Sequence, residues 1–438
     1  MDSSIPSTSE PALRRVIGVG GLAAAIFNIT IGAAIFVLPA HMAASLGAAA
    51  PLAYGICVVA TALVALCFAE AGSRVAGSGG PYAFVQVALG PYVGYLCGVL
   101  LWLGVTIAMG AVGTVLVGAL ATLVPALGGT VARAAVLVVL YAGLATVNAR
   151  GADWGSRLSG ISTLAKLLPL VAFVLLGLSH VQPANLAITT LPPVGKIGEA
   201  GLLLMFAFFG MESALQVSGE VIEPARVVPR AIALALTAIG LLYVSVQLVA
   251  QGVLGAALAT PDAASAPLAL AAAQFAGAAG SRLILIGMLV STFGFMAGMM
   301  LSTPRTLFAL ARDGYLPQSL ARVHPAHRTP HVAIGVQGVI VFAIAMTGTY
   351  VNLAIKADVA ILLVYLACCI GAWRLRRLDI LPETGTPFRM PGGAVVPWLA
   401  AALIVGLLIG ASWDTWRLTL AVIAVASLGF VAQKRGKR

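Results

Sequence analysis

Residues 28–40 read NITIGAAIFVLPA, and this stretch decides how the rest of the chain is interpreted. Its side chains suit a lipid environment, yet Asn28, the two β-branched residues before Gly32, and Pro39 all weaken an α-helix. Non-helical backbone at membrane depth is tolerated only where protein encloses it or where it lines a cavity. The stretch therefore predicts a membrane segment that is interrupted at a binding site.

The whole chain has the composition of an integral membrane protein. Its 438 residues are 61% hydrophobic and 9% charged, and the mean hydropathy is +1.04. A soluble core does not bury that much apolar surface, so the solvent must be a bilayer. Residues 1–15 are polar and lack the apolar core and cleavage site of a signal peptide, which predicts an N-terminal tail that is kept.

Membrane spans follow from the length of the apolar runs. A helix needs ~20 apolar residues to cross ~30 Å of hydrocarbon. About twelve runs of this kind lie near 16–40, 48–71, 82–124, 131–149, 157–180, 197–219, 229–256, 280–311, 331–350, 354–376, 394–412 and 413–432. The third and eighth runs exceed the requirement, which predicts tilting or projection into the cytoplasm. We expect a single-domain, all-α protein with about twelve spans.

Basic residues predict the orientation. If the N-terminus is cytoplasmic, that side collects most of the Lys and Arg residues, including Arg74, Arg150, Arg230, Arg305, Arg312, Arg328 and Arg374. The opposite side keeps only Arg133, Lys196, Arg282, Lys356 and Arg417. The positive-inside rule then predicts both termini in the cytoplasm and an even number of crossings. We interpret the net charge of +11 as this bias rather than as a nucleic-acid surface.

No pattern indicates an enzyme, a metal site or a cofactor. The cysteines lie in apolar runs without the spacing of zinc ligands, and no histidine lies in the middle of a run. The chain also lacks a catalytic-triad motif and a Walker-type GK[ST] sequence. We therefore expect no catalytic residues, no bound metal and no cofactor.

A second interrupted run is the counterpart of the first. Residues 202–221 read LLLMFAFFGMESALQVSGEV, and Gly210 separates a phenylalanine-rich half from a more polar one. Each interrupted run opens a set of five, which predicts inverted repeats at 16–180 and 197–376 within a transport core at 16–376. Two peripheral helices at 392–432 and a basic cytoplasmic tail at 433–438 follow. The alternative is that Gly32 and Gly210 only permit close helix packing; their matched placement favours a site.

An interrupted helix suits a zwitterion. The unwound turn exposes amides at the start of one half-helix and carbonyls at the end of the other. Such a site holds a carboxylate and an ammonium together, which is the head group of an amino acid.

Several motifs resemble signatures of the amino acid, polyamine and organocation transporter family. They are TIGAAIF at 30–36 with the proline at 39, GGPYAFVQVALGPYVGYLCGVLLWL at 79–103, FAFFGMES at 206–213, GEVIEPARVVPRAI at 219–232 and LFALARDGYLPQSLARVHPAHRTP at 307–330. The similarity runs from about residue 14 to residue 335, in order. It implies the five-plus-five inverted-repeat fold with two additional C-terminal helices, and alternating access across the membrane.

The resemblance also implies the residues of the site. The amides around Gly32, Ala33 and Ala34, between Ile31 and Ile35, would hold the substrate carboxylate. The carbonyls before Gly210 would hold its amino group, namely those near Phe206, Ala207 and Phe209. Further walls would be Gly104, Val105 and Met109 of the third run and Met299 of the eighth. Ala34 replaces the family's usual glycine, and the apolar walls predict a small or medium neutral L-amino acid.

Lys166 lies about eight residues into the fifth run, hence ~12 Å along a helix. One interpretation is that its side chain snorkels back to the interface. The resemblance implies another, in which a lysine replaces the metal ion that braces segment one against segment eight in sodium-driven relatives. Its ammonium would then reach the turn at Gly32 and the pair Ser291 and Thr292. Because burial favours a neutral amine, we expect protons as the coupling ion.

Two acids near the second interruption have open roles. Glu212 is either a partner for the substrate amine or for Lys166, or a buried acid bonded to backbone or to a neighbouring helix. Glu220, with Glu223 and the arginines beside it, either pairs with Arg305 or Arg312 to close an inner gate or is simply solvated charge.

We expect a secondary active transporter of the cytoplasmic membrane that takes up a neutral L-amino acid with protons. Its partners are then the substrate, protons and lipid, with no nucleic acid; the sequence indicates no particular oligomer. An amino acid/amine exchanger or exporter of the same fold is the alternative. A non-transporting sensor is less favoured because the tails are short, and a channel because the apolar runs lack rings of charge.

Overall fold

The structure is a computed structural model that describes residues 17–75, 80–150, 166–212, 221–381 and 386–436. Within these ranges the protein is all-helical, and the one β-bridge is an isolated parallel pair between Ile17 and Val221. Seven of the described helices are long and apolar enough to cross a membrane, and shorter apolar helices lie between them. The prediction of an all-α membrane fold with about twelve spans is confirmed.

The helices follow the order of the expected runs. Segment one consists of α1 (Val19–Thr30) and α2 (Ala34–Leu46), and segment six begins with α8 (Val194–Met205). The others are α3 (Ala50–Arg74), α4 (Pro81–Leu89), α5 (Pro91–Leu123), α6 (Thr130–Arg150), the helix Lys166–His180, α10 (Pro224–Leu254), α11 (Pro267–Arg312), α12 (His331–Thr347), α13 (Tyr350–Arg377), α14 (Val395–Ile409) and α15 (Trp413–Gly436).

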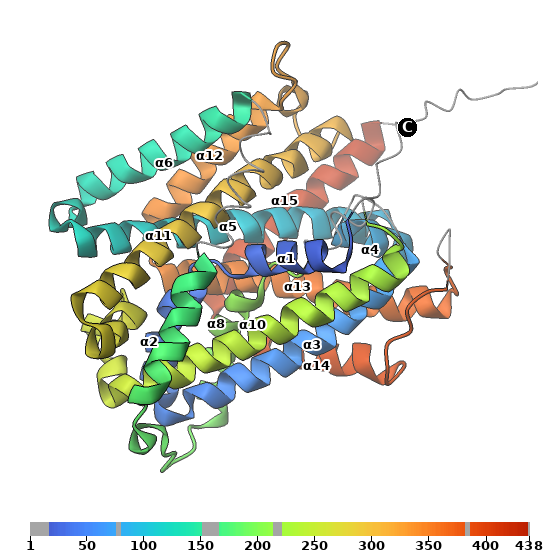
Figure 1. The fold of residues 1–438 in the computed structure, drawn as a ribbon. Coiled ribbons are helices and arrows are strands. Elements are labelled where there is room, and N and C mark those ends of the chain that lie inside the picture. The colour runs from blue at the N-terminus through green and yellow to red at the C-terminus, as the bar shows by residue number, and fades with distance from the viewer. Residues whose placement is uncertain (1–16, 76–79, 151–165, 213–220, 382–385, 437–438) are drawn as a thin grey trace, which may run out of the picture.

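Central and peripheral helices differ in how they use apolar residues. In Figure 1, α6, α11 and α12 lie along one side and α3, α10 and α14 along the other, with α1, α5 and α13 between them. Contacts agree, since α5 packs against α13, α11 and α12, and α10 packs against α3 and α1. The apolar surface of α5 is mostly buried, whereas α6 and α15 turn most of theirs outward. Hydrocarbon outside the bundle accounts for the outward-facing apolar side chains.

Three expected boundaries were wrong. The run at 82–124 is two helices, because Gly90 adopts a φ of 95° that ends α4 before α5 begins. The run at 280–311 extends back to Pro267, with a kink at Gly277, whose φ is 58°. Pro39 does not end the first segment: α2 continues through it to Leu46, since a proline removes one hydrogen bond while buried packing holds the helix.

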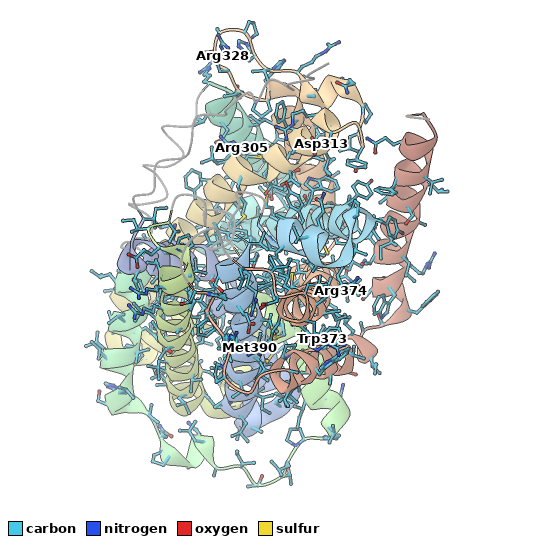
Figure 2. All side chains as sticks on the ribbon, turned by 90° about the vertical axis from the view of Figure 1, so that its right-hand side faces the viewer. Arg305, Asp313, Arg328, Trp373, Arg374 and Met390 are labelled. Carbon is cyan, nitrogen blue, oxygen red and sulfur yellow. The ribbon has the colours of Figure 1, made fainter. Side chains whose placement is uncertain are left out.

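A buried ion pair fastens one end of the bundle. Arg74 was expected at the cytoplasmic surface, but its side chain is 1% exposed and its Nη2 lies 2.9 Å from Glu70 Oε1. Arg74 also donates to the carbonyl of Ile380 at 2.9 Å, and the amide of Met390 donates to Glu70 Oε2 at 3.0 Å. Figure 2 faces this end and labels Met390 on the connection that returns from α13. The pair therefore ties the chain after α13 to the end of α3.

Candidate functional site

The first helix break comprises residues 31–33, between α1 and α2. Its exposed carbonyls are held by side chains of other segments. The ammonium of Lys166 donates to the carbonyl of Asn28 and, at 2.8 Å, to that of Ile31. The hydroxyl of Ser291 donates to the carbonyls of Ile31 at 3.3 Å and Gly32 at 3.0 Å. The helix Lys166–His180 and α11 thus brace this break from two sides.

The backbone amides at the start of α2 form the other side of the first break. Ala33 is the N-cap of α2 and has no side-chain acceptor for the amides that follow it. The first amides of an α-helix have no carbonyl of a preceding turn to bond, and the helix dipole adds partial positive charge there. The start of α2 therefore offers an anion site beside Ala33 and Ala34.

The second helix break comprises residues 206–212. Here α8 ends at Met205, a short 3₁₀ turn covers Phe206–Phe208, and Gly210 has a φ of 119°. A Cβ on Gly210 would lie 2.8 Å from the amide nitrogen of Thr30 and 3.0 Å from the carbonyl carbon of Ile29. The backbone of the second break therefore rests directly against the end of α1, and only glycine fits there.

Tyr243 of α10 joins the two breaks. Its hydroxyl lies 3.2 Å from the carbonyl of Thr30 and 3.0 Å from that of Ala207, and its side chain is fully buried. One phenol thus touches the carbonyl ends of both half-helices. No sequence pattern indicates this role, since a tyrosine in an apolar run is usually a packing residue.

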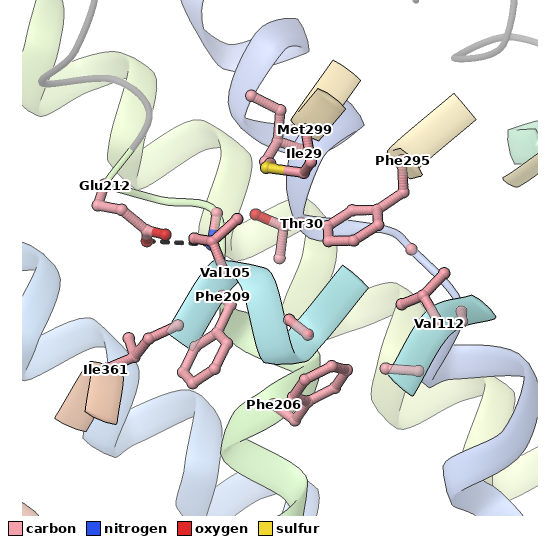
Figure 3. Close-up of a pocket in the computed structure, with 15 residues that line it drawn as sticks. Ile29, Thr30, Val105, Val112, Phe206, Phe209, Glu212, Phe295, Met299 and Ile361 are labelled. Atoms are coloured by element: carbon pink, nitrogen blue, oxygen red, sulfur yellow. Dashed lines mark hydrogen bonds between the residues drawn. The ribbon is translucent and has the colours of Figure 1, made fainter. Parts of the chain in front are cut away.

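A pocket lies where the two breaks meet (Figure 3). Counted together with the solvent at its open mouth, its empty space is about 450 Å³. Phe206, Phe209 and Ile361 form one wall, and Phe295 and Met299 lie opposite. The remaining lining residues are Ile29, Thr30, Gly32, Ala33, Ala34, Val105, Ala108, Val112, Gly210 and Glu212. The pocket is apolar apart from a threonine, a glutamate and the backbone of the breaks.

The structure brings together most of the residues expected in the site. The expected residues that line the pocket are Gly32, Ala33, Ala34, Val105, Phe206, Phe209, Gly210, Glu212 and Met299. Those beside it but outside its lining are Ile31, Ile35, Gly104, Met109 and Ala207. The helical period explains the difference on α5, where Val105, Ala108 and Val112 share one face. Gly104 faces α13 instead, and a Cβ there would lie 2.4 Å from Ile361 Cγ1.

The pair expected on segment eight divides between two roles. Ser291 contacts the first break, as described above. Thr292 does not, because its hydroxyl donates to the carbonyls of Met288 and Leu289 in its own helix, at 2.8 and 2.9 Å. Adjacent side chains on a helix point about 100° apart, so when Ser291 faces the first break, Thr292 faces away from it.

Glu212 lines the pocket with its carboxylate already bonded. Its Oε2 accepts the amide of Gly210 at 3.0 Å and the hydroxyl of Tyr365 at 2.7 Å. Figure 3 draws the first of these bonds across the turn of the second break. This arrangement matches the alternative of an acid bonded to backbone and a neighbouring helix, and the carboxylate keeps its place in the pocket wall.

The described residues of the expected inner gate do not pair across segments, as the gate would require; they bond to neighbours in sequence. Glu223 pairs with Arg226 at 3.5 Å, and Arg312 pairs with its neighbour Asp313 at 3.3 Å. Arg305 donates to the carbonyl of Leu301 in its own helix. Glu220 lies outside the described residues.

Comparisons with known proteins agree with this architecture. Residues 17–430 match the model of the family described as amino acid permease. A methylthioribose transporter of Bacillus subtilis is 27% identical over 97% of this chain and 94% of its own length. A branched-chain amino acid permease of the same organism is 27% identical over 93% of this chain and 90% of its own. A serine/threonine exchanger, also of Bacillus subtilis, is 27% identical over 75% of this chain and 76% of its own. The chain belongs to the amino acid permease family, and it is a multi-pass membrane transporter.

Proposed function

We propose that this transporter carries a small or medium neutral L-amino acid across the cytoplasmic membrane by alternating access, coupled to protons. The observation that carries the proposal is the position of the apolar pocket, directly between two touching helix breaks. The start of α2 would bind the substrate carboxylate through the amides at Ala33 and Ala34. Carbonyls of the second break, at Phe206 and Phe209, would bind its ammonium.

The character of the pocket supports a neutral substrate. A cationic side chain would need an acid with free acceptor capacity, and an anionic one a basic group. The lining contains no lysine or arginine among the described residues, and its one acid, Glu212, already accepts the Gly210 amide and the Tyr365 hydroxyl through Oε2. Aromatic and branched aliphatic walls suit an uncharged side chain, in keeping with a relative that is a branched-chain amino acid permease.

The position of Lys166 supports proton coupling. Its side chain is fully buried and reaches the carbonyls of Asn28 and Ile31, so it links the helix Lys166–His180 to the first break. A neutral amine would make weaker bonds to these carbonyls than an ammonium does. Loss of the proton would therefore loosen α1 from its brace, and its return would tighten it.

The first experiment identifies the substrate. The purified protein is screened by thermal shift against the twenty L-amino acids, common amines and methylthioribose. Uptake of the best stabiliser is then measured in proteoliposomes with and without an inward proton gradient. We expect a neutral amino acid to stabilise the protein and a proton gradient to drive its accumulation. Stabilisation by methylthioribose or an amine alone would refute the amino acid proposal.

A pocket variant tests where the substrate binds. Replacing Phe209 with alanine removes a ring from the wall, so we expect the preference to shift from leucine toward phenylalanine by about tenfold, or ~1.4 kcal/mol. Phe430→Ala is the matched control, because Phe430 packs against Tyr95 and Tyr315 away from the pocket. An equal shift in both variants would contradict the proposed site.

An exchanger of the same fold is the second candidate, favoured by the serine/threonine exchanger among the relatives. Uptake into empty vesicles, compared with uptake into vesicles preloaded with substrate, separates a symporter from an exchanger. A symporter accumulates substrate into empty vesicles under a proton gradient, whereas an obligatory exchanger requires internal substrate.

We also propose that both termini face the cytoplasm and that the core at 16–376 consists of two inverted repeats. The arginine-rich end of α13 supports the orientation. Reporter fusions at each terminus test it: activity of a reporter that works only outside the cytoplasm would refute it.

A further inference from the structure

Asp358 is a carboxyl group without a role in the transport cycle proposed above. It lies in α13, eight residues after Tyr350, and therefore ~12 Å along the helix from that end. Its side chain is fully buried. Neither carboxyl oxygen has a hydrogen-bond partner among the described residues. No lysine, arginine or histidine of the described chain forms an ion pair with it.

The surroundings of Asp358 are weakly polar. The backbone of Phe206, at the start of the second break, lies beside the carboxyl without a hydrogen bond of normal geometry. The titratable groups within electrostatic reach are Cys57 of α3 and, on α13 itself, Tyr350 and Tyr365. The phenol of Tyr350 in turn faces those of Tyr54 and Tyr243. None of these groups carries a positive charge.

The two carboxyl groups near the pocket, Glu212 and Asp358, differ in the hydrogen bonds that offset their burial. Glu212 receives a backbone amide and a phenol, which can stabilise an ionised carboxylate. Asp358 receives no donor in normal hydrogen-bond geometry among the described residues, and an ionised carboxylate in that position would keep much of the cost of removal from water. A neutral carboxylic acid avoids most of that cost.

The helix geometry places Asp358 next to the substrate pocket. Asp358, Ile361 and Tyr365 are spaced i, i+3 and i+7, so they share one face of α13. Ile361 lines the pocket, and Tyr365 holds Glu212. Asp358 therefore lies one turn from the pocket wall, on the side of α8 and the start of the second break.

We propose that Asp358 is a proton-binding residue of the transport cycle, protonated in the conformation seen here and deprotonated when α8 and the second break move away from α13. In that step its O–H bond breaks, the proton passes to entering water, and the electron pair stays on the carboxylate oxygen. The unpartnered phenols of Tyr54 and Tyr350 supply donors for the carboxylate once the side chains turn. This inference rests on the proposed alternating-access function, and it gives the coupling proton a second site besides Lys166.

Infrared spectroscopy tests the protonation state without any substrate. Spectra of the reconstituted protein at neutral pH are compared between the wild type and D358N. We expect a protonated-carboxyl C=O band in the wild type that D358N removes. The variant D414N serves as the matched control, because Asp414 is exposed and paired with Lys356; it should leave the band in place. A wild-type minus D358N difference spectrum without a protonated-carboxyl band overturns the inference.

Transport measurements test the role in coupling. Leucine uptake and leucine counterflow are measured in proteoliposomes containing the wild type, D358N or D414N. D358N should lose the stimulation of uptake by an inward proton gradient while counterflow remains measurable, because the neutral amide imitates a permanently protonated carboxyl. Full proton-gradient stimulation in D358N overturns the inference. If the wild type moves no amino acid, the proposed function fails, and the infrared result still decides the state of Asp358.

Discussion

The two helix breaks are built in different ways. The first, at residues 31–33, has no positive φ at Gly32 and is held by side chains from three other segments: Lys166, Tyr243 and Ser291. The second, at residues 206–212, depends on Gly210, with its positive φ and its contact with the end of α1. The two glycines interrupt their apolar runs in the same way in the sequence, but only Gly210 is sterically required.

This difference indicates that the two breaks have different roles. A break braced by side chains changes with the protonation or movement of those side chains. A break defined by backbone contact transmits displacement of one half-helix directly to the other. We therefore expect the first break to govern coupling and the second to govern the geometry of the site, and two pairs of variants and one substitution of Lys166 test this view.

The largest effect is expected from Gly210→Ala. A Cβ at a φ of 119° is strained, and it would also lie within 3.0 Å of the backbone of α1. We expect a loss of about 4 kcal/mol in stability, from backbone strain and overpacking together. The apparent melting temperature in detergent and uptake in vesicles should both collapse.

Gly32→Ala is the matched control for that variant. A Cβ there meets the ring of Phe295 at 3.5 Å, which is ordinary contact, and φ is not positive. We expect a change within about 1 kcal/mol. Equal damage from both substitutions would show that the breaks depend on glycine in the same way.

Lys166→Met should have the second largest effect. Methionine keeps most of the packing volume but removes the donor shared by the carbonyls of Asn28 and Ile31. Each buried acceptor that loses its partner costs ~1–3 kcal/mol, so we expect about 2–3 kcal/mol and no response of uptake to a pH gradient. Accumulation that still follows the pH gradient in this variant would exclude Lys166 from proton coupling.

The smallest effect is expected from the adjacent pair on α11. Ser291→Ala removes the hydroxyl bonded to the carbonyls of Ile31 and Gly32, at a cost of about 1 kcal/mol. Thr292→Ala removes a hydroxyl that bonds only its own helix, so stability should change less. Thermal shift and uptake rates compare the two, and a larger loss for Thr292→Ala would contradict the bracing role of Ser291.

Much of the fold was predictable because membrane segments carry a strong local signal. Apolar length gave the spans, and the resemblance gave their arrangement into a transporter fold. The errors fell at Gly90, Gly277 and Pro39, where the outcome depends on tertiary packing. A glycine or proline shows where a helix is weak, but neighbouring helices decide whether it bends.

The site was predictable at its breaks and less so in its walls. Gly32, Gly210, Val105 and Met299 all line the pocket. Phe295 and Ile361 were missed, because the face that a helix turns inward depends on its rotation within the bundle. Asp358 was missed for a related reason: its position in an apolar run was visible, but its lack of partners was not.

The sequence alone determined that the chain lives in a bilayer, that two of its apolar runs contain residues that weaken a helix, and that Lys166 falls inside an apolar run. These follow from residue chemistry, because hydrocarbon penalises charge and unpaired backbone wherever they occur. Only the tertiary structure decided that the two breaks touch and that Tyr243 joins them. It also decided that Asp358 has no hydrogen-bond partner among the described residues while Glu212 has two. Contacts between segments far apart in the chain depend on how helices are rotated and packed, and no local pattern encodes that.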